Sequence, residues 1–220
     1  MVQVTAFKWV PPFAQGSVRD LRVRWALEEA GVSYDARLIG FEDQATPEYR
    51  AMQPFGQVPA YRDGDVAIFE SCAIVLHIAG KSGALMPTDD AGRAEVTCWL
   101  FAASNSIEPW VGQLAGIDLF AADSAWGKER RPEVETFVRR RLDDLQTALG
   151  DKSWFAADRF SAADIIMTHV LRDLRHTTIL SDYPKLAAYV ARAEARPAFQ
   201  KALGAQMAAF RETEKTMAAA

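Results

Sequence analysis

One stretch, Phe55–Ser71, limits the possible folds more than any other part of the sequence. It contains a residue followed by proline, Val58-Pro59, and two short apolar runs separated by Asp63-Gly64. A proline favours extended backbone at the residue before it, and an Asp-Gly pair between apolar runs predicts a β-hairpin. The apolar run Cys72–Ala79 follows directly and predicts a helix. The stretch therefore predicts two antiparallel strands that lead into the N-terminus of a helix.

The start of that helix is a candidate anion-binding site. Glu70 and Ser71 precede the helical run, and the first N–H groups of a helix, at the positive end of its dipole, favour a small anion such as a carboxylate. Val58 would add the backbone edge of an extended segment. Together these features would suit a short peptide with an acidic end. The alternative for Ser71 is an ordinary N-cap with no ligand.

The segments before this stretch predict a βαβ unit. Residues 2–9 alternate apolar and polar side chains and predict a first strand, and residues 34–39 predict a second. Between them, residues 18–30 have apolar side chains at helical spacing, with Gly31 as a C-cap. Strand, helix and strand in this order predict a right-handed crossover. This predicted helix also carries five charged side chains: Arg19, Arg22, Arg24, Glu28 and Glu29.

From residue 92 on, the sequence predicts helices and no strand. Leu85–Asp90 holds a proline and two acidic residues and marks a domain boundary. Helices are predicted over residues 95–111, which Pro109 ends or kinks, from Pro132 to near residue 150, and over residues 186–195 and 198–210. Residues 118–131 have only a weak helical pattern. Ser161 and Asp164 form a capping box at the start of a further helix, and its loss would cost roughly 0.5–2 kcal/mol.

Composition and charge exclude several classes of protein. The net charge of −4 provides no positive field for nucleic acid or an anionic membrane. No apolar stretch reaches the ~18 residues of a membrane span, and no signal-peptide pattern opens the chain. Cys72 and Cys98 are far apart, which argues against a disulfide scaffold and fits a reducing cytoplasm. The histidines have no carboxylates at ligand spacing, so no metal site is expected.

Part of this stretch also resembles a known family. The residues Gly-Gln-Val-Pro-Ala at 56–60, followed by Glu70-Ser71, are similar to the glutathione-binding segment of the cytosolic glutathione transferases, of a bacterial type whose subclass stays open. The resemblance implies an α/β thioredoxin-like domain at residues 1–84, a linker at 85–91 and an all-α domain at 92–220. It also implies glutathione as co-substrate and a homodimer.

The resemblance assigns a role to each residue of the segment. In the family the Val-Pro bond is cis, so the Val58–Pro59 bond is expected to be cis. The backbone of Val58 would pair with the cysteinyl unit of glutathione. Glu70 and Ser71 would hold the γ-glutamyl group, and Gln57 would contact the glycyl end.

Activation of the glutathione thiol requires a hydroxyl near the start of the first helix. A free thiol has a pKa of about 8.5, and lowering it by about two units needs roughly 2.7 kcal/mol in favour of the anion. A hydroxyl hydrogen bond to a charged sulfur supplies roughly 1.5–3 kcal/mol, and a helix N-terminus adds roughly 0.3–1 kcal/mol. One Ser or Tyr would therefore suffice.

Ser17 is the candidate for this hydroxyl, because no other Ser, Thr or Tyr lies between Thr5 and Ser33. The resemblance places Ser17 at the activating serine of serine-type transferases, although Val18 stands where those enzymes usually have proline. The tyrosine of tyrosine-type enzymes falls on Phe13, which has no hydroxyl. The alternative for Ser17 is a loop or N-cap residue without a role in catalysis.

The predicted function is conjugation of the glutathione thiolate to small apolar electrophiles. Candidate residues for the electrophile pocket are Phe13, Phe101, Asn105 and Trp110. One alternative is another glutathione-dependent enzyme on the same fold, namely a peroxidase, isomerase or dehalogenase. A second alternative is a binding or scaffold protein without activity. No nucleic acid or membrane partner is expected.

Overall fold

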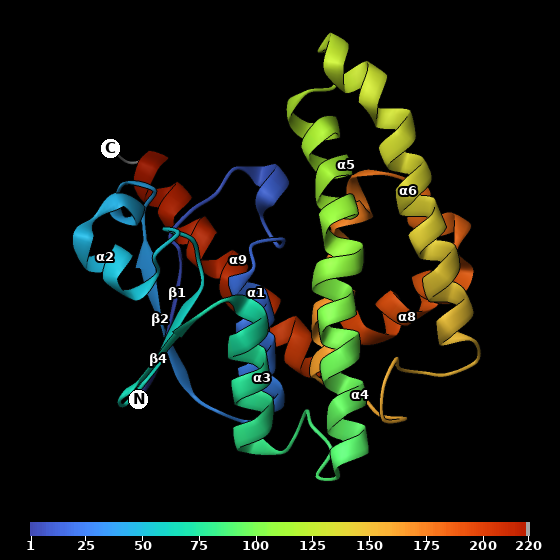
Figure 1. The fold of residues 1–220 in the computed structure, drawn as a ribbon. Helices are drawn as coiled ribbons and strands as arrows, with labels where there is room; N and C mark the ends of the chain where they lie inside the picture. Colours follow the sequence, from blue (N-terminus) through green and yellow to red (C-terminus); the bar gives the residue numbers. More distant parts are fainter. Residues whose placement is uncertain (219–220) are drawn as a thin grey trace. The chain divides into compact units, whose positions relative to one another are not determined.

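The computed structural model describes residues 1–218, which form two compact units (Figure 1). The α/β unit comprises Met1–Leu85 and the chain from Ala195 on, and the helical unit comprises Met86–Glu194. The last helix, α9 (Pro197–Ala218), therefore belongs to the α/β unit, whereas the sequence pattern grouped it with the other helices. It packs on α1 (Asp20–Glu29), where its Phe199 ring contacts Trp25 at a centroid distance of 4.9 Å.

The α/β unit contains a four-stranded mixed sheet of the thioredoxin-like kind. Its strands are β1 (Val2–Phe7), β2 (Tyr34–Ile39), β3 (Ala60–Asp63) and β4 (Val66–Phe69), in the order β2-β1-β3-β4. β1 runs parallel to β2, and the other two pairs are antiparallel. Asp63 pairs with Val66, so the hairpin loop is Gly64-Asp65 rather than Asp63-Gly64. Gly64 has a φ of 59°, as a tight hairpin requires.

Helices cover both faces of this sheet. Val4 lies directly opposite Tyr61, so both point to one face, and Tyr61 contacts His77 of α3 (Ser71–Ser82). Thr5 points to the other face, because successive side chains alternate. There its hydroxyl contacts Tyr49 of α2 (Pro47–Met52). The shorter 3₁₀ turns η1 (Pro12–Ala14) and η2 (Glu42–Ala45) lie in the connections.

The helix α1 is buried along most of its length, including the charged side chains of Arg22 and Arg24. Arg22 is 1% exposed and Arg24 is 3% exposed. The nitrogen Nε of Arg24 donates to Asp20 Oδ2 at 2.7 Å, and Gln206 of α9 donates to Asp20 Oδ1 at 2.6 Å. The periodicity of residues 18–30 could not reveal this, because the covering helix comes from the far end of the chain.

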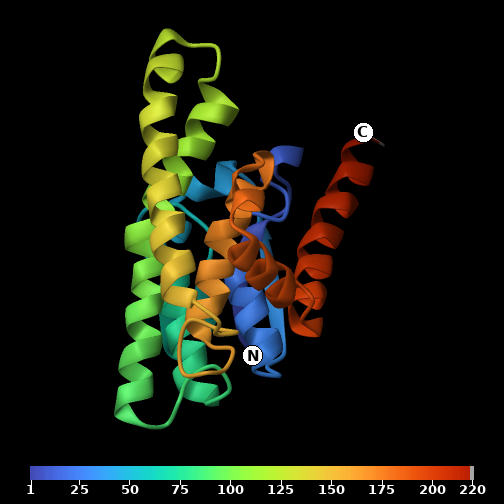
Figure 2. The same cartoon turned by 90° about the vertical axis from the view of Figure 1, so that its right-hand side faces the viewer.

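The helical unit contains α4 (Asp90–Phe101), the π-helical η3 (Ala102–Ile107), α5 (Glu108–Phe120), α6 (Ala125–Leu149), α7 (Ala162–Arg172), η4 (Asp173–His176), η5 (Ile179–Asp182) and α8 (Pro184–Glu194). Figure 1 shows α4 and α5 continuing in one direction, and Figure 2 shows α6 beside α5. Pro109 lies in the first turn of α5, where its missing N–H costs little, and the wider π segment precedes it.

The prediction that a helix opens at Pro132 is wrong, because Pro132 lies inside α6. The helix begins after Ser124, whose hydroxyl accepts a hydrogen bond from the Gly127 N–H at 2.9 Å. A proline inside a helix costs about 3 kcal/mol. The buried face of α6 offsets this cost, and its members are Val134, Val138, Leu142, Leu145 and Leu149. Among the residues described, no helix is both long and apolar enough to cross a membrane.

The predicted capping box is present at the start of α7 and is larger than the sequence suggests. The buried carboxylate of Asp164 accepts hydrogen bonds from the Ser161 N–H at 2.9 Å and the Ser161 hydroxyl at 3.0 Å. It also accepts from the Phe155 N–H at 3.1 Å and the Tyr189 hydroxyl at 3.0 Å. Burial raises the pKa of Asp164, and these donors oppose that rise. One carboxylate therefore joins α7, α8 and the segment before α7.

Replacing this carboxylate should destabilise the helical unit. We expect Asp164→Ala to lower the free energy of unfolding by about 3 kcal/mol or more, because it leaves several buried donors without an acceptor. Asp144→Ala is the control: Asp144 is 61% exposed and pairs with Arg141, so its loss should cost at most about 0.5 kcal/mol. Urea unfolding of both variants measures the difference. Equal midpoints for the two would contradict the proposed importance of the network.

Candidate functional site

Buried hydroxyls hold the bend between Gln57 and Ala60. The Val58–Pro59 peptide bond is cis, as the family resemblance implies. The Tyr49 hydroxyl donates to Gln57 O at 2.7 Å and lies 3.0 Å from the Thr5 hydroxyl, which accepts from the Ala60 N–H at 2.7 Å. These contacts connect the bend to β1 and α2. Tyr49 and Thr5 were not predicted to be part of the site, because nothing in the local pattern relates them to residues 57–60.

Val58 presents its backbone while its side chain is buried. The side chain packs in a cluster with Ile39 and Tyr49, against which Phe7 and Val18 also pack. Within residues 1–218, no hydrogen bond reaches the N–H or C=O group of Val58. Both groups therefore remain able to bond water or an extended ligand. The neighbouring Gln57 side chain is exposed.

The N-terminus of α3 has an unusual backbone conformation. Glu70, its N-cap residue, has φ 72° and ψ 113°, a region that residues other than glycine rarely adopt. Such conformations concentrate at functional sites. The Glu70 carbonyl accepts from the Ile74 N–H at 2.9 Å, while its side chain is exposed and forms no ion pair within the described chain. Ser71, the first residue of α3, is buried.

Arg22 is a functional candidate that the sequence analysis missed. Its Nη1 donates to Ser71 Oγ at 3.2 Å from within the core. Because the Ser71 oxygen accepts this bond, the hydroxyl proton remains available to a ligand. The guanidinium charge and the α3 dipole both favour an anion at this point. The chemistry therefore matches the carboxylate end of a small peptide.

The structure places Ser17 in the turn between η1 and α1. The Ser17 N–H donates to Ala14 O at 3.0 Å. The N-cap of α1 is Arg19, so Ser17 is not the N-cap residue. Its side chain is half-buried and its hydroxyl has no hydrogen-bond partner among residues 1–218. The next residue, Val18, packs against the cluster that contains Val58, which brings the Ser17 turn to the bend at residues 57–60.

The four residues predicted to line an electrophile pocket differ in their surroundings. Phe13 lies on η1 of the α/β unit and is 47% exposed. In the helical unit, Phe101 ends α4 and is also 47% exposed, and Asn105 follows on the π segment with an exposed side chain. Trp110 instead stacks on Phe137, with ring centroids 4.5 Å apart and planes 16° apart. This contact joins α5 to α6 and accounts for Trp110 by packing.

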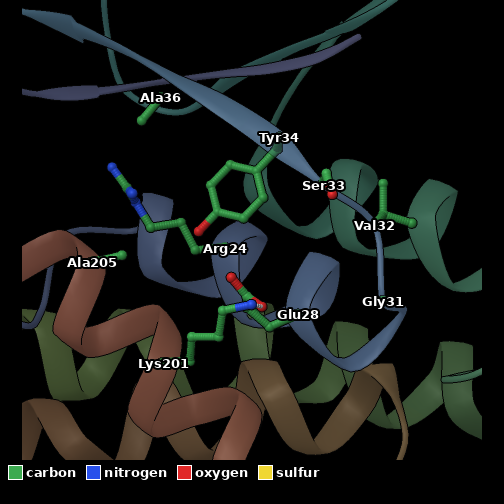
Figure 3. A pocket seen from close by; sticks show the side chains of 9 residues that line it. All are labelled: Arg24, Glu28, Gly31, Val32, Ser33, Tyr34, Ala36, Lys201 and Ala205. Atoms are coloured by element: carbon green, nitrogen blue, oxygen red, sulfur yellow. Dashed lines mark ion pairs between the residues drawn. The ribbon is translucent and has the colours of Figure 1, made fainter.

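A pocket of about 460 Å³ lies at the other end of the sheet in the α/β unit (Figure 3). It lies between the start of β2, α1 and α9. Its Glu28 carboxylate pairs with Lys201 at 2.7 Å, and the Arg24 guanidinium lies 5.9 Å from the centre of the Tyr34 ring. None of the predicted site residues lines it. The described residues contain no cluster of His, Cys, Asp and Glu that could hold a metal ion, and neither Cys72 nor Cys98 is part of a disulfide.

The fold is that of a thioredoxin-like protein, with an open backbone edge at Val58 beside a cis proline and a buried hydroxyl at the start of α3. Two family models match the chain: the glutathione S-transferase N-terminal domain at residues 4–80 and the C-terminal domain at residues 118–205. A probable glutathione S-transferase of Oryza sativa subsp. japonica is 30% identical over 191 residues, which cover 80% of this chain and 86% of that protein. The chain belongs to the glutathione S-transferase family.

Other relatives and solved structures agree. Glutathione S-transferase 4 of Zea mays is 29% identical over 212 residues, covering 90% of this chain and 91% of that protein. A glutathione transferase of Burkholderia graminis, with two glutathione molecules bound per subunit, is 29% identical with a TM-score of 0.80 and covers 92% of this chain and 87% of its own. One from Pseudomonas putida, with one glutathione disulfide bound, is 26% identical with a TM-score of 0.81 over 92% and 90% of the chains.

The hydroxyl of Tyr49 should matter for ligand binding. We expect Tyr49→Phe to lower the free energy of unfolding by about 1 kcal/mol, because one buried hydrogen bond is lost. The lost bond holds the bend at residues 57–60, so the Kd for glutathione should rise roughly fivefold. Tyr183→Phe is the matched control, because the Tyr183 hydroxyl also donates to a backbone carbonyl, Arg139 O at 3.0 Å, but in the helical unit. Calorimetric titration with glutathione measures both. If both variants bind glutathione equally well, Tyr49 does not set the shape of the site.

Proposed function

We propose that the protein is a glutathione transferase that conjugates the glutathione thiolate to small apolar electrophiles. The observation that carries this proposal is the pair formed by Val58 and Ser71: an unbonded backbone edge beside a cis proline, and a buried hydroxyl at a helix start that accepts from Arg22. Membership of the family, and the glutathione bound in related structures, support the choice of ligand.

Each part of glutathione has a proposed partner in the α/β unit. The γ-glutamyl carboxylate would accept from the Ser71 hydroxyl and the first N–H groups of α3, and its ammonium would pair with the exposed Glu70 carboxylate. The cysteinyl unit would form two backbone hydrogen bonds with Val58, beside Pro59. The Gln57 side chain would donate to the glycyl end.

Ser17 would stabilise the reactive anion. The bound thiol loses its proton to water, and the Ser17 hydroxyl donates a hydrogen bond to the resulting thiolate. A charge-assisted bond of this kind contributes roughly 1.5–3 kcal/mol, enough to lower the thiol pKa by about one to two units. The sulfur then attacks the electrophilic carbon, a C–S bond forms, and the leaving group departs with the bonding electron pair.

The exposed side chain of Phe13, in the α/β unit, is a proposed contact for the electrophile. The apolar ring of Phe13 suits a small apolar compound, whereas Trp110 is assigned to packing. We also infer that the protein works as a homodimer in the cytoplasm, as its family suggests. Size-exclusion chromatography with light scattering would test the dimer.

A second candidate function is reduction of hydroperoxides. The Burkholderia graminis structure holds two glutathione molecules per subunit and the Pseudomonas putida structure holds glutathione disulfide. A peroxidase consumes two glutathione molecules and one hydroperoxide and yields the disulfide, an alcohol and water. Parallel assays with an aryl halide and with cumene hydroperoxide would distinguish this reaction from conjugation.

The ionisation of bound glutathione tests the proposal directly. Thiolate absorbance near 240 nm, followed from about pH 5 to 9, should show the bound thiol ionising well below the free pKa of about 8.5. Because the folded site favours the anion, the thiolate signal should persist at pH values where free glutathione has lost it. A normal titration of bound glutathione would reject thiol activation, and absence of binding would reject the site.

The role of Ser17 has a separate test. We expect Ser17→Ala to reduce kcat more than tenfold, as loss of a charge-assisted hydrogen bond of about 1.5–3 kcal/mol implies, with little change in glutathione affinity. Ser33→Ala serves as control, since Ser33 is an exposed hydroxyl in the connection after α1. Unchanged turnover in Ser17→Ala would leave Ser17 as a loop residue only.

A further inference from the structure

The final helix, α9, contacts the loop that carries Ser17, and these contacts extend over most of the length of the loop. This β1–α1 loop comprises residues 8–19. At its start, the Thr213 hydroxyl donates to Lys8 O at 2.8 Å. At its end, Gln206 Nε2 lies 3.3 Å from Val18 O, as well as 2.6 Å from Asp20 Oδ1. Both contacts lie inside the α/β unit and join residues about two hundred positions apart in sequence.

A single carboxylate oxygen joins the two arms of this loop. Glu214 Oε1 accepts from Trp9 Nε1 at 3.0 Å and from Gln15 Nε2, also at 3.0 Å. The same Gln15 nitrogen lies 3.2 Å from Val10 O, so the two arms are also bonded to one another. Trp9 precedes η1 and Gln15 follows it. The carboxylate therefore adds a second connection between the two arms, and the two donors lower the pKa of Glu214.

We propose that Glu214 is a positioning residue for thiol activation: through Trp9 and Gln15 it holds the β1–α1 loop so that the Ser17 hydroxyl meets the glutathione sulfur. This inference rests on the proposed function. Ser17 lies two residues beyond Gln15, and the hydroxyl itself has no other partner among residues 1–218 that would fix its direction. The groups proposed to hold glutathione lie on the bend at residues 57–60 and on α3, and within residues 1–218 no hydrogen bond joins the Glu214 side chain to either.

This separation predicts a specific kinetic pattern. Glu214→Ala should reduce kcat roughly tenfold, because small displacements of a catalytic group are costly, while the Kd for glutathione stays within about twofold. The pKa of the bound thiol should rise towards the free value of about 8.5. Glu214→Gln should recover most of the activity, because an amide oxygen can still accept both hydrogen bonds.

The matched control is Glu212→Ala. Glu212 is an exposed carboxylate on the same helix whose side chain pairs with Lys215 at 3.7 Å and, among the described residues, forms no hydrogen bond or ion pair with the loop. Like Glu214→Ala, the Glu212→Ala variant replaces a glutamate of α9 by alanine and removes one negative charge. It should leave kcat and the pKa of the bound thiol unchanged. A purely structural effect of altering α9 would change both variants alike and would overturn the proposal.

A spectroscopic measurement reports on the loop itself. The indole N–H resonance of Trp9, assigned with Trp9→Phe, should shift in Glu214→Ala, return close to its original position in Glu214→Gln and stay unchanged in Glu212→Ala. If that resonance shifts in Glu214→Ala while kcat and the thiol pKa match the unaltered protein, the positioning role is wrong and the proposed function stands. If the unaltered protein itself does not lower the pKa of the glutathione thiol, the proposed function fails and the inference fails with it.

Discussion

The burial of α1 is the constraint on which the α/β unit depends. The helix has the sheet and α3 on one side and α9 on the other, so charged residues that would normally face water lie in the core. Removing an ion from water costs on the order of several kcal/mol. Hydrogen bonds from Arg24 and Gln206 to the Asp20 carboxylate offset this cost, and Arg22 donates a hydrogen bond to Ser71. Burial raises the pKa of Asp20, while Arg24 and Gln206 oppose it. The hydrogen bond from Arg22 also orients Ser71 in the candidate site.

The local part of the site could be predicted because its signals are adjacent in sequence. The hairpin, the cis bond at Val58–Pro59 and the helix start at Ser71 all follow from residues 55–71 and from the family resemblance. Arg22 and Tyr49 escaped prediction because each acts through a partner far along the chain. A periodic pattern reports which face of a helix is apolar, but it cannot report that a second helix covers the polar face.

The fold class was predictable for a similar reason, and the errors are confined to particular elements. The order of strands and helices in residues 1–82 agrees with the pattern. The prediction that a helix begins at Pro132 was wrong, because a proline usually marks the end of a helix. In α6 the burial of one apolar face outweighs the one missing hydrogen bond. The position of α9 could not be seen from its own sequence, since an amphipathic helix shows only that it packs on something.

The return of the chain to the α/β unit after Glu194 has a consequence for the order of folding. Residues 86–194 are contiguous, and their contacts can form as soon as that segment is available. The α/β unit is instead split, and α1 exposes its buried charges and Trp25 until α9 arrives. Contacts between such distant segments are slow to form, and during synthesis they require almost the whole chain. The unit that is translated first is therefore the unit that is completed last.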